Sequence, residues 1–271
     1  ITYILINWGW QWSFYISALI GLAAGAGWYL LARDSPREHP WVSEREAAHI
    51  EAGLPASAGE LEKHQTLPWT TILTNKNMRA ISVSYFTFGY VAYIFFTWFF
   101  IYLSRVRGLD LKSSALYSML PFLAMATCSP LGGWIADKLT ASHGKRVGRC
   151  GVAVFGIAMS AVFLALATQV ESARLASIVL AGGAGALYLS QSAFWAVTAD
   201  IAGSSAGSVS GLMNMGGQIG GAVTASLTPL IADRFGWTAS FLVAAGLCVV
   251  GALAWLLVNP NQTIAGGPAK A

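Results

Sequence analysis

The stretch Gly9-Trp10-Gln11-Trp12-Ser13-Phe14 occurs a second time as Gly236-Trp237-Thr238-Ala239-Ser240-Phe241, a shift of 227 positions. At the same shift Ala18 meets Ala245, Trp28 meets Trp255 and Leu30 meets Leu257. Seven of the 23 positions from 9 to 31 are identical, where ordinary residue frequencies give about two. Each copy leads into a long apolar helix, so we expect the last element of one repeat followed by a whole second repeat.

The composition predicts an all-α integral membrane protein. Hydrophobic residues make up 55% of the 271 positions, charged residues 10%, and the mean hydropathy is +0.58, values that are rare in soluble domains. The apolar runs are too long for strands and lack the alternation of a membrane barrel. A bilayer-crossing helix needs roughly 20 residues. Seven transmembrane helices are predicted, at 12–32, 80–103, 114–136, 147–168, 174–199, 207–232 and 237–258.

The spans divide the chain into four parts. Residues 1–33 hold the last helix of the truncated first repeat, 34–79 form a polar cytoplasmic loop, 80–258 form a six-helix bundle, and 259–271 form a cytoplasmic tail. Within the loop, Ser43-Glu44-Arg45-Glu46 predicts a capped helix that ends near Gly53, and Pro68 and Trp69 begin an interfacial helical turn. The chain starts without Met or a charged leader, so its opening is expected to be a truncation.

The orientation follows from the Lys and Arg residues of the connections. One face carries 11 of them, including Lys270, and the other carries 5. We therefore expect the segment 60–65 and the C-terminus in the cytoplasm, in a multi-pass protein of the bacterial inner (plasma) membrane. A basic membrane face also accounts for the net charge of +4 without a nucleic-acid partner. Cys128, Cys150 and Cys248 show no metal or redox spacing and are expected to be buried thiols.

The connection Gly133-Trp134-Ile135-Ala136-Asp137-Lys138-Leu139, followed by Gly144-Lys145-Arg146, is the sharpest local motif. A small residue permits close helix packing, and a carboxylate and a basic cluster hold the turn at the interface. A simple positive-inside anchor would have the same residues. The motif also resembles the Gly-x-x-x-Asp-(Arg/Lys)-x-Gly-(Arg/Lys)-(Arg/Lys) signature of the major facilitator superfamily, with four additional residues between Leu139 and Gly144. We expect a gating motif formed by Gly133, Asp137, Lys138, Gly144, Lys145 and Arg146.

The resemblance covers nearly the whole chain and extends to one branch of the superfamily. The two Gly-Trp stretches, Trp28-Tyr29 with Arg33-Asp34-Ser35-Pro36, and Gly207-Ser208-Val209-Ser210-Gly211-Leu212-Met213-Asn214-Met215-Gly216-Gly217 are similar to anion:cation symporters of the hexuronate, glucarate and galactonate type. The resemblance implies the sixth helix of the first half plus the complete six-helix second half of the fold.

Three helices offer candidate substrate-binding residues. Gly207, Gly211, Asn214, Gln218 and Gly221 follow spacings of 4, 3, 4 and 3 and share one helix face. Asn214 and Gln218 can donate hydrogen bonds to a hydroxylated substrate, as the resemblance implies for Asn214, or can join two helices. Trp195, which shares a face with Ser192, matches a substrate-lining position of the family; the alternative is a packed aromatic. Tyr93 is a further candidate, although aromatic stripes at its spacing are more often packing.

The spans hold no Asp, Glu, Lys, Arg or His in their interiors. Ion coupling and anion binding need such groups, which in the resembling family belong to the first half. We expect part of a secondary active transporter that takes up a small organic anion with a proton or cation by alternating access. It would act with lipid and the missing first half of the same transporter. The sequence predicts no enzyme, catalytic set, cofactor or metal site. A non-transporting membrane fragment and a seven-helix receptor are the alternatives.

Overall fold

The computed structural model describes residues 2–53 and 67–265. The chain forms two compact units, unit 1 (Ile1–His64) and unit 2 (Gln65–Ala271), which we describe separately. The segment 60–65 and Lys270, on which part of the predicted orientation depends, lie outside the described residues. Every regular element in the described ranges is helical, so the all-α prediction holds there.

Unit 1 contains one long apolar helix and a short polar one. Its elements are α1 (Thr2–Trp8), α2 (Trp10–Leu31), the 3-10 turn η1 (Pro36–Glu38) and α3 (Glu44–Gly53). With 22 residues, α2 is about 33 Å long, enough to cross a hydrocarbon core of about 30 Å. The Oγ of Ser43 accepts a hydrogen bond from the Glu46 amide at 3.3 Å, as the predicted cap requires.

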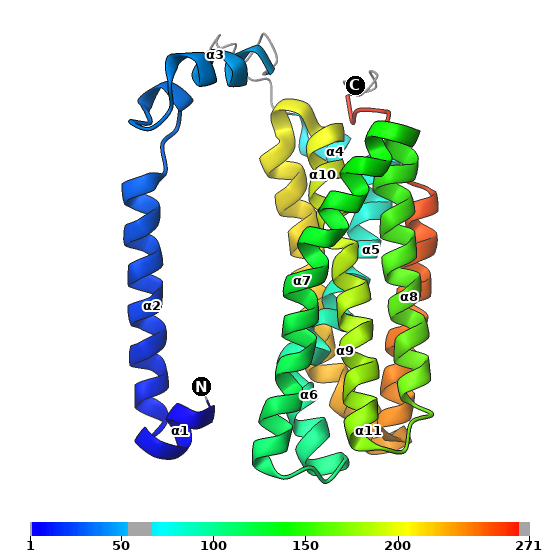
Figure 1. Ribbon diagram of the computed structural model, residues 1–271. Helices are drawn as coiled ribbons and strands as arrows, with labels where there is room; N and C mark the ends of the chain where they lie inside the picture. The colour runs from blue at the N-terminus through cyan, green and yellow to red at the C-terminus, as the bar shows by residue number, and fades with distance from the viewer. Residues whose placement is uncertain (1, 54–66, 266–271) are drawn as a thin grey trace. The chain divides into compact units, whose positions relative to one another are not determined.

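Unit 2 is a bundle of long helices (Figure 1). Its first elements are α4 (Trp69–Thr74), α5 (Lys76–Tyr93), η3 (Ile94–Trp98), α6 (Phe99–Ile101), η4 (Tyr102–Val106) and α7 (Leu111–His143). They are followed by η5 (Arg146–Gly151), α8 (Val152–Ala167), α9 (Ala173–Leu189), α10 (Gln191–Ala202), η6 (Gly203–Ser205) and α11 (Ala206–Leu256). The segments η3, η4 and η5 are π-helical, which the sequence analysis did not predict.

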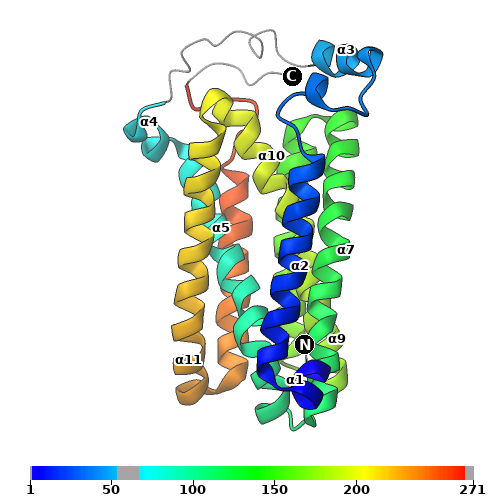
Figure 2. The ribbon, with the colours of Figure 1, turned by 90° about the vertical axis from the view of Figure 1, so that its left-hand side faces the viewer.

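In the described residues, six helical stretches are long and apolar enough to cross a membrane, where the sequence predicted seven. The difference arises in α11, which contains both of the predicted spans 207–232 and 237–258. Between them, Gly236 has a non-helical backbone (φ 84, ψ 162). Ser240 Oγ donates to the Thr228 carbonyl at 3.0 Å across 12 positions, a separation of about 18 Å in a straight helix. The chain therefore folds back at Gly236 into two arms, 206–235 and 237–256 (Figure 2).

The sequence repeat has a matching backbone conformation. Gly9, between α1 and α2, has φ 86 and ψ 166, almost the same as Gly236 in α11. A positive φ strains residues that carry a Cβ but not glycine. Both copies of the Gly-Trp pair thus use glycine to turn the chain into the next helix.

Glycines set the close packing of α5 against the first arm of α11. A Cβ added to Gly217 would come within 2.7 Å of the Tyr85 ring, and one added to Gly220 within 2.1 Å of the Phe86 carbonyl oxygen. On α5, a Cβ at Gly89 would lie 2.0 Å from the Gly217 carbonyl oxygen. The second arm of α11 also packs on α5, where Gly251 contacts Thr87. Helix α5 therefore packs on both arms of α11, far away in sequence.

The other long helices pack around this pair. Helix α7 continues through Pro121 and Pro130 and packs mainly on α9, while α8 packs on α9 and α11. At the α7–α9 crossing, a Cβ at Gly132 would lie 2.1 Å from the Leu189 carbonyl oxygen. Of the three thiols, Cys150 and Cys248 are buried and Cys128 is half-buried, and all three are free.

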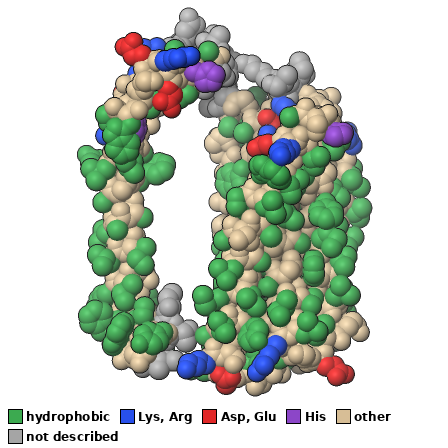
Figure 3. All heavy atoms as spheres, viewed as in Figure 1, with side chains coloured by type: hydrophobic (Ala, Val, Ile, Leu, Met, Phe, Trp, Pro, Cys, Tyr) green, Lys and Arg blue, Asp and Glu red, His purple; other side chains and the backbone are tan. Residues whose placement is uncertain are grey.

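Several helix ends meet at one end of unit 2, which we call the Asp200 end: the starts of α5 and η5 and the ends of α7, α10 and α11. The Asn77 side chain links two of them, accepting from the Asn259 amide at 2.8 Å and donating to the Asn259 carbonyl at 2.9 Å. The Ile264 amide donates to the Ile201 carbonyl at 2.9 Å. In the view of Figure 3, charged side chains of unit 2 lie at its two ends and hydrophobic side chains along its length.

Candidate functional site

Tyr93 and Gln218, two residues predicted separately, form a direct pair. The Tyr93 hydroxyl at the end of α5 donates to Gln218 Oε1 of α11 at 2.6 Å. A Cβ on Gly221 would lie 2.6 Å from the Tyr93 ring, so only glycine leaves room for the ring against α11. The π-helix η3 begins directly after Tyr93, a deviation that is frequent at functional sites.

Asn214 lies one helical turn before Gln218 on α11, on the same face. Its side chain is half-buried. Gly207 and Gly211, further back on this face, are exposed, and an added Cβ would meet nothing within 4 Å. Of the glycines on the predicted face, Gly207 and Gly211 are therefore open in unit 2 and Gly221 is packed. The other glycines of this arm that pack tightly, Gly217 and Gly220, lie outside the predicted face.

Trp195 lies at the edge of an aromatic cluster formed by α5, α9, α10 and α11. Its side chain is 43% exposed and its ring is edge-on to Tyr85 at 6.5 Å. Tyr85 stacks on Phe88 at 5.2 Å, which contacts Tyr188 of α9 at 5.2 Å. One side of Trp195 is thus packed and the other is accessible.

Tyr85 connects the two groups of candidates, and sequence analysis did not identify it. Its ring contacts Trp195 of α10 on one side and Gly217, next to Gln218, on the other. The i, i+3 aromatic spacing of Tyr85 and Phe88 was the available signal, but the residue predicted on this helix was Tyr93.

Ser192 faces a neighbouring helix. The Cβ position of Gly133 on α7 would lie 3.5 Å from Ser192 Cβ and 3.7 Å from its Oγ. This Oγ is buried and has no hydrogen-bond partner among the described residues. The adjacent Gln191 accepts from Ser129 Oγ of α7 at 3.1 Å. Ser192 therefore lies at the α7–α10 contact, next to the first residue of the predicted gating motif.

The charged residues of that motif join an ion network at the Asp200 end. Arg149 Nη1 donates to Asp137 Oδ1 at 2.8 Å, and its Nε lies 3.7 Å from Asp200 Oδ2. Lys145 Nζ lies 3.3 Å from Asp200 Oδ1. Asp200 and both cations are mostly buried, with 16–20% of each side chain exposed, whereas Asp137 is 70% exposed. Asp200 is the centre of the network, and the predicted motif contained neither it nor Arg149.

The remaining motif residues make other contacts. Lys138 Nζ lies 3.9 Å above the Trp134 ring, and Arg146 Nη2 donates to the Leu256 carbonyl at 3.4 Å. Gly144 turns the chain with φ 83. Gly133, the first glycine of the motif, was expected to permit close helix packing, but a Cβ there would have ordinary contact distances. The tight helix crossing is at the preceding residue, Gly132.

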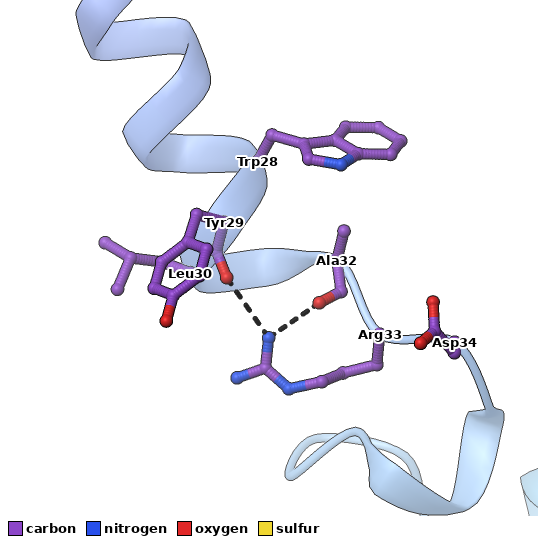
Figure 4. A pocket seen from close by; sticks show the side chains of 6 residues that line it. All are labelled: Trp28, Tyr29, Leu30, Ala32, Arg33 and Asp34. Atoms are coloured by element: carbon purple, nitrogen blue, oxygen red, sulfur yellow. Dashed lines mark hydrogen bonds between the residues drawn. The ribbon is translucent and has the colours of Figure 1, made fainter.

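A shallow pocket of ≈ 440 Å³ lies at the end of α2 and is lined by Trp28, Tyr29, Leu30, Ala32, Arg33 and Asp34 (Figure 4). Arg33 Nη1 donates to the Ala32 carbonyl at 2.6 Å and the Tyr29 carbonyl at 3.4 Å. The guanidinium therefore satisfies carbonyls left free by the helix end. We read this pocket as a helix terminus and not as a binding site.

Two pKa shifts outside the spans have simple local causes. Two hydrogen bonds from Arg37 to the Glu51 carboxylate, both 2.6 Å, together with the charge of Arg37, lower the pKa of Glu51. Hydrogen bonds from Ser113 at the start of α7 lower the pKa of Asp110. In residues 2–53 and 67–265, no three His, Cys, Asp or Glu side chains are grouped to hold a metal ion.

Known transport proteins resemble this chain over almost its whole length. It is 31% identical to the protein named "Probable sulfoacetate transporter SauU" of Cupriavidus necator over 269 residues, which cover 97% of this chain and 61% of that protein. It is 30% identical to the hexuronate transporter of Bacillus subtilis, with 98% and 61% covered. It is also 30% identical to the chloroplastic ascorbate transporter of Arabidopsis thaliana, with 96% and 48% covered. The chain thus spans about half to three-fifths of these relatives.

The family model of the Major Facilitator Superfamily matches residues 1–225 and 143–271. The two matches overlap and together include both copies of the Gly-Trp stretch and the Asp137 motif. They confirm the family resemblance that the sequence motifs predicted. This chain belongs to the Major Facilitator Superfamily.

Proposed function

We propose that this chain is part of a secondary active transporter that moves a small organic anion, such as a sugar acid, across the membrane by alternating access. The names of its relatives support an anionic substrate. The proposal includes coupling to a proton or another cation and operation with further helices of the first half. The sequence repeat supports such a first half, because only its last element has a copy here.

One observation carries the proposal: α10 and the first arm of α11 carry neutral hydrogen-bonding and aromatic side chains that are at least partly exposed on unit 2. The Asn214 side chain is half-buried, and the Tyr93–Gln218 pair lies one helical turn away from it. Trp195 exposes one side of its indole. Amides suit substrate hydroxyls and an indole suits the apolar side of a sugar. We infer that this half of the transporter holds the uncharged part of the substrate and the first half its carboxylate.

In this proposal the two arms of α11 cross the membrane separately, so the described helices make seven spans. The first would be the sixth helix of the first half. We also propose that the Asp200 end faces the cytoplasm of a bacterial inner membrane, because the segments assigned to that side contain more Lys and Arg residues. The C-terminus would then be cytoplasmic.

Uptake measurements test whether ion coupling depends on the first half of the transporter. The protein of residues 1–271 in vesicles is expected to give no substrate accumulation driven by a proton or sodium gradient, because its spans contain no interior carboxylate. A version extended at the N-terminus by the first-half helices of a relative should accumulate hexuronate or a similar acid. Gradient-driven accumulation by residues 1–271 would show that coupling resides here. No uptake by an extended, folded version would favour a non-transporting membrane protein.

We further propose that the ion network holds the Asp200 end closed. Asp200→Asn leaves Lys145 and Arg149 without their shared carboxylate and is expected to destabilise this end by about 1–3 kcal/mol. Asp137→Asn removes a mostly exposed partner and should cost about 0–1 kcal/mol. The two variants form a matched pair because both replace an Asp that contacts Arg149.

Cys150 provides the measurement. It is buried beside Arg149, and its Sγ lies 3.8 Å from the Val258 carbonyl. With Cys128 and Cys248 replaced by alanine, alkylation of Cys150 by a maleimide should be several-fold faster in Asp200→Asn than in Asp137→Asn. Equal protection of Cys150 in both variants, at equal melting temperature, would contradict the closing role of Asp200.

A further inference from the structure

A groove of ≈ 870 Å³ lies on the surface of unit 2 between the start of α5 and the end of α11. It is separate from the candidate substrate face, which involves the end of α5 and the first arm of α11. Its walls are mostly aliphatic, and two basic residues lie at its mouth. The lining residues are Lys76, Arg79, Ala80, Val83, Val250, Leu253, Ala254, Leu256 and Leu257.

The groove has a polar end and an apolar end. Helix α5 enters the bundle at Lys76, and the second arm of α11 runs antiparallel to it, as the Asn77–Asn259 hydrogen bonds and the Gly251–Thr87 contact show. Lys76 and Arg79 are therefore level with the end of α11. Val83, about 10 Å further along α5 than Lys76, is level with the aliphatic residues of α11. In the proposed topology, depth in the membrane therefore increases from the cations to the aliphatic walls.

Both cations are available to an anion from outside the bundle. Lys76 and Arg79 are exposed, and neither is in any of the ion pairs found among the described residues. Nearby, Trp69 and Leu73 of α4 are also exposed, which is typical of residues at the membrane interface. In the proposed topology the mouth of the groove therefore lies at the level of the lipid headgroups.

We propose that this groove binds an anionic phospholipid, with its phosphate at Lys76 and Arg79 and an acyl chain along Val83, Val250 and Leu253. Charge complementarity selects the headgroup, because basic residues at a membrane surface attract anionic lipids. The aliphatic walls offer no hydrogen bonds to a hydroxylated substrate, but they match a hydrocarbon chain. The proposal adds a lipid site to the transporter and does not depend on which substrate it carries.

Native mass spectrometry of residues 1–271 in detergent tests the site, with phosphatidylglycerol and phosphatidylcholine of identical acyl chains as probes. Two cations near the lipid surface predict a preference for phosphatidylglycerol of about five- to thirty-fold. Lys76→Gln with Arg79→Gln should abolish that preference. The matched control, Arg105→Gln with Lys112→Gln at the opposite end, should leave it unchanged. Both pairs lie on the surface, and a melting curve confirms that each variant is folded.

A second variant tests the apolar part. Val83 is 47% exposed, so Val83→Trp can fill the groove without disturbing the core and should reduce retention of phosphatidylglycerol several-fold while both cations remain. Equal retention of the two lipids by the unmodified protein would overturn the proposal, as would a preference that survives the Lys76/Arg79 double variant. Displacement of the lipid by millimolar inorganic phosphate would also overturn it, because it would indicate a simple anion site.

Discussion

Gly220→Ala is expected to lower the melting temperature of this protein, whereas Gly211→Ala in the same helix is expected to leave it unchanged or raise it. Alanine favours a helix by about 1 kcal/mol over glycine, and at Gly211 nothing lies within 4 Å of the new methyl group. At Gly220 the methyl group would lie 2.1 Å from the Phe86 carbonyl oxygen. This oxygen belongs to the backbone of α5 and cannot rotate away from the methyl group as a side chain could. The helices α5 and α11 must therefore separate, at a cost of about 1–3 kcal/mol or more.

Both variants gain the helix preference of alanine, so the clash alone separates them, and Gly220→Ala should be less stable than Gly211→Ala by about 1–3 kcal/mol or more. Thermal unfolding of the purified chain in one detergent, followed by the loss of monodisperse protein, measures the difference. Gly89→Ala, which opposes the Gly217 carbonyl in the same interface, should behave like Gly220→Ala. Equal melting temperatures for Gly220→Ala and Gly211→Ala would show that the two helices are not packed as described.

This glycine pair also shows where sequence reasoning stops. The helix wheel correctly placed Gly207, Gly211, Asn214 and Gln218 on one face of α11. It could not tell which face is buried, because that depends on α5, which is over 110 positions away in the chain. Close contact with α5 uses Gly217 and Gly220, and the predicted face is open apart from Gly221. Periodicity is local information, whereas burial depends on the partner helix.

The same limit applies to the charged network. The motif around Asp137 was recognisable because its residues are close in sequence and have a characteristic spacing. Asp200 has no such neighbours, because its partners are over 50 positions earlier in the chain. Lys145 lies just before η5, and Arg149 lies within η5. Hydropathy placed all these residues correctly at span ends, where charges avoid the membrane interior. Only the fold brings them together.

The turn at Gly236, by contrast, was accessible from sequence. The repeat aligned Gly236 with Gly9, and the two residues have nearly the same backbone conformation. The predicted spans 207–232 and 237–258 end and begin at this turn. Information about the fold was available here because the chain contains two copies of one element, and each copy predicts the other.

In the complete transporter, Asn214→Ala is expected to weaken binding of a sugar acid while folding and membrane insertion stay nearly intact. An amide hydrogen bond to a substrate hydroxyl contributes about 0.5–1.5 kcal/mol, or up to about 3 kcal/mol if its loss leaves a buried partner unsatisfied. Affinity should therefore fall by roughly a few-fold to a hundred-fold. The side chain is half-buried and open, so its removal leaves the described helix packing unchanged.

Trp195→Ala examines the same site from α10. Its indole packs on Tyr85 on one side, and the exposed side is the proposed platform for the sugar. Its removal should weaken binding of six-carbon sugar acids more than that of small anions such as acetate, because only the larger ligands can cover the ring. Ser226→Ala, at an exposed polar position further along the first arm of α11, serves as the control and should change neither affinity.

Binding and melting temperature measured together on each variant separate a substrate site from a structural contact. If Asn214 and Trp195 bind substrate, affinity falls while the melting temperature changes by little more than in Ser226→Ala. If the two side chains instead join α10 and α11 to first-half helices, the melting temperature falls and the affinity of the remaining folded protein is unchanged. The second pattern in both variants would exclude this face as the substrate site, and the Tyr93–Gln218 pair would then be a helix-to-helix hydrogen bond.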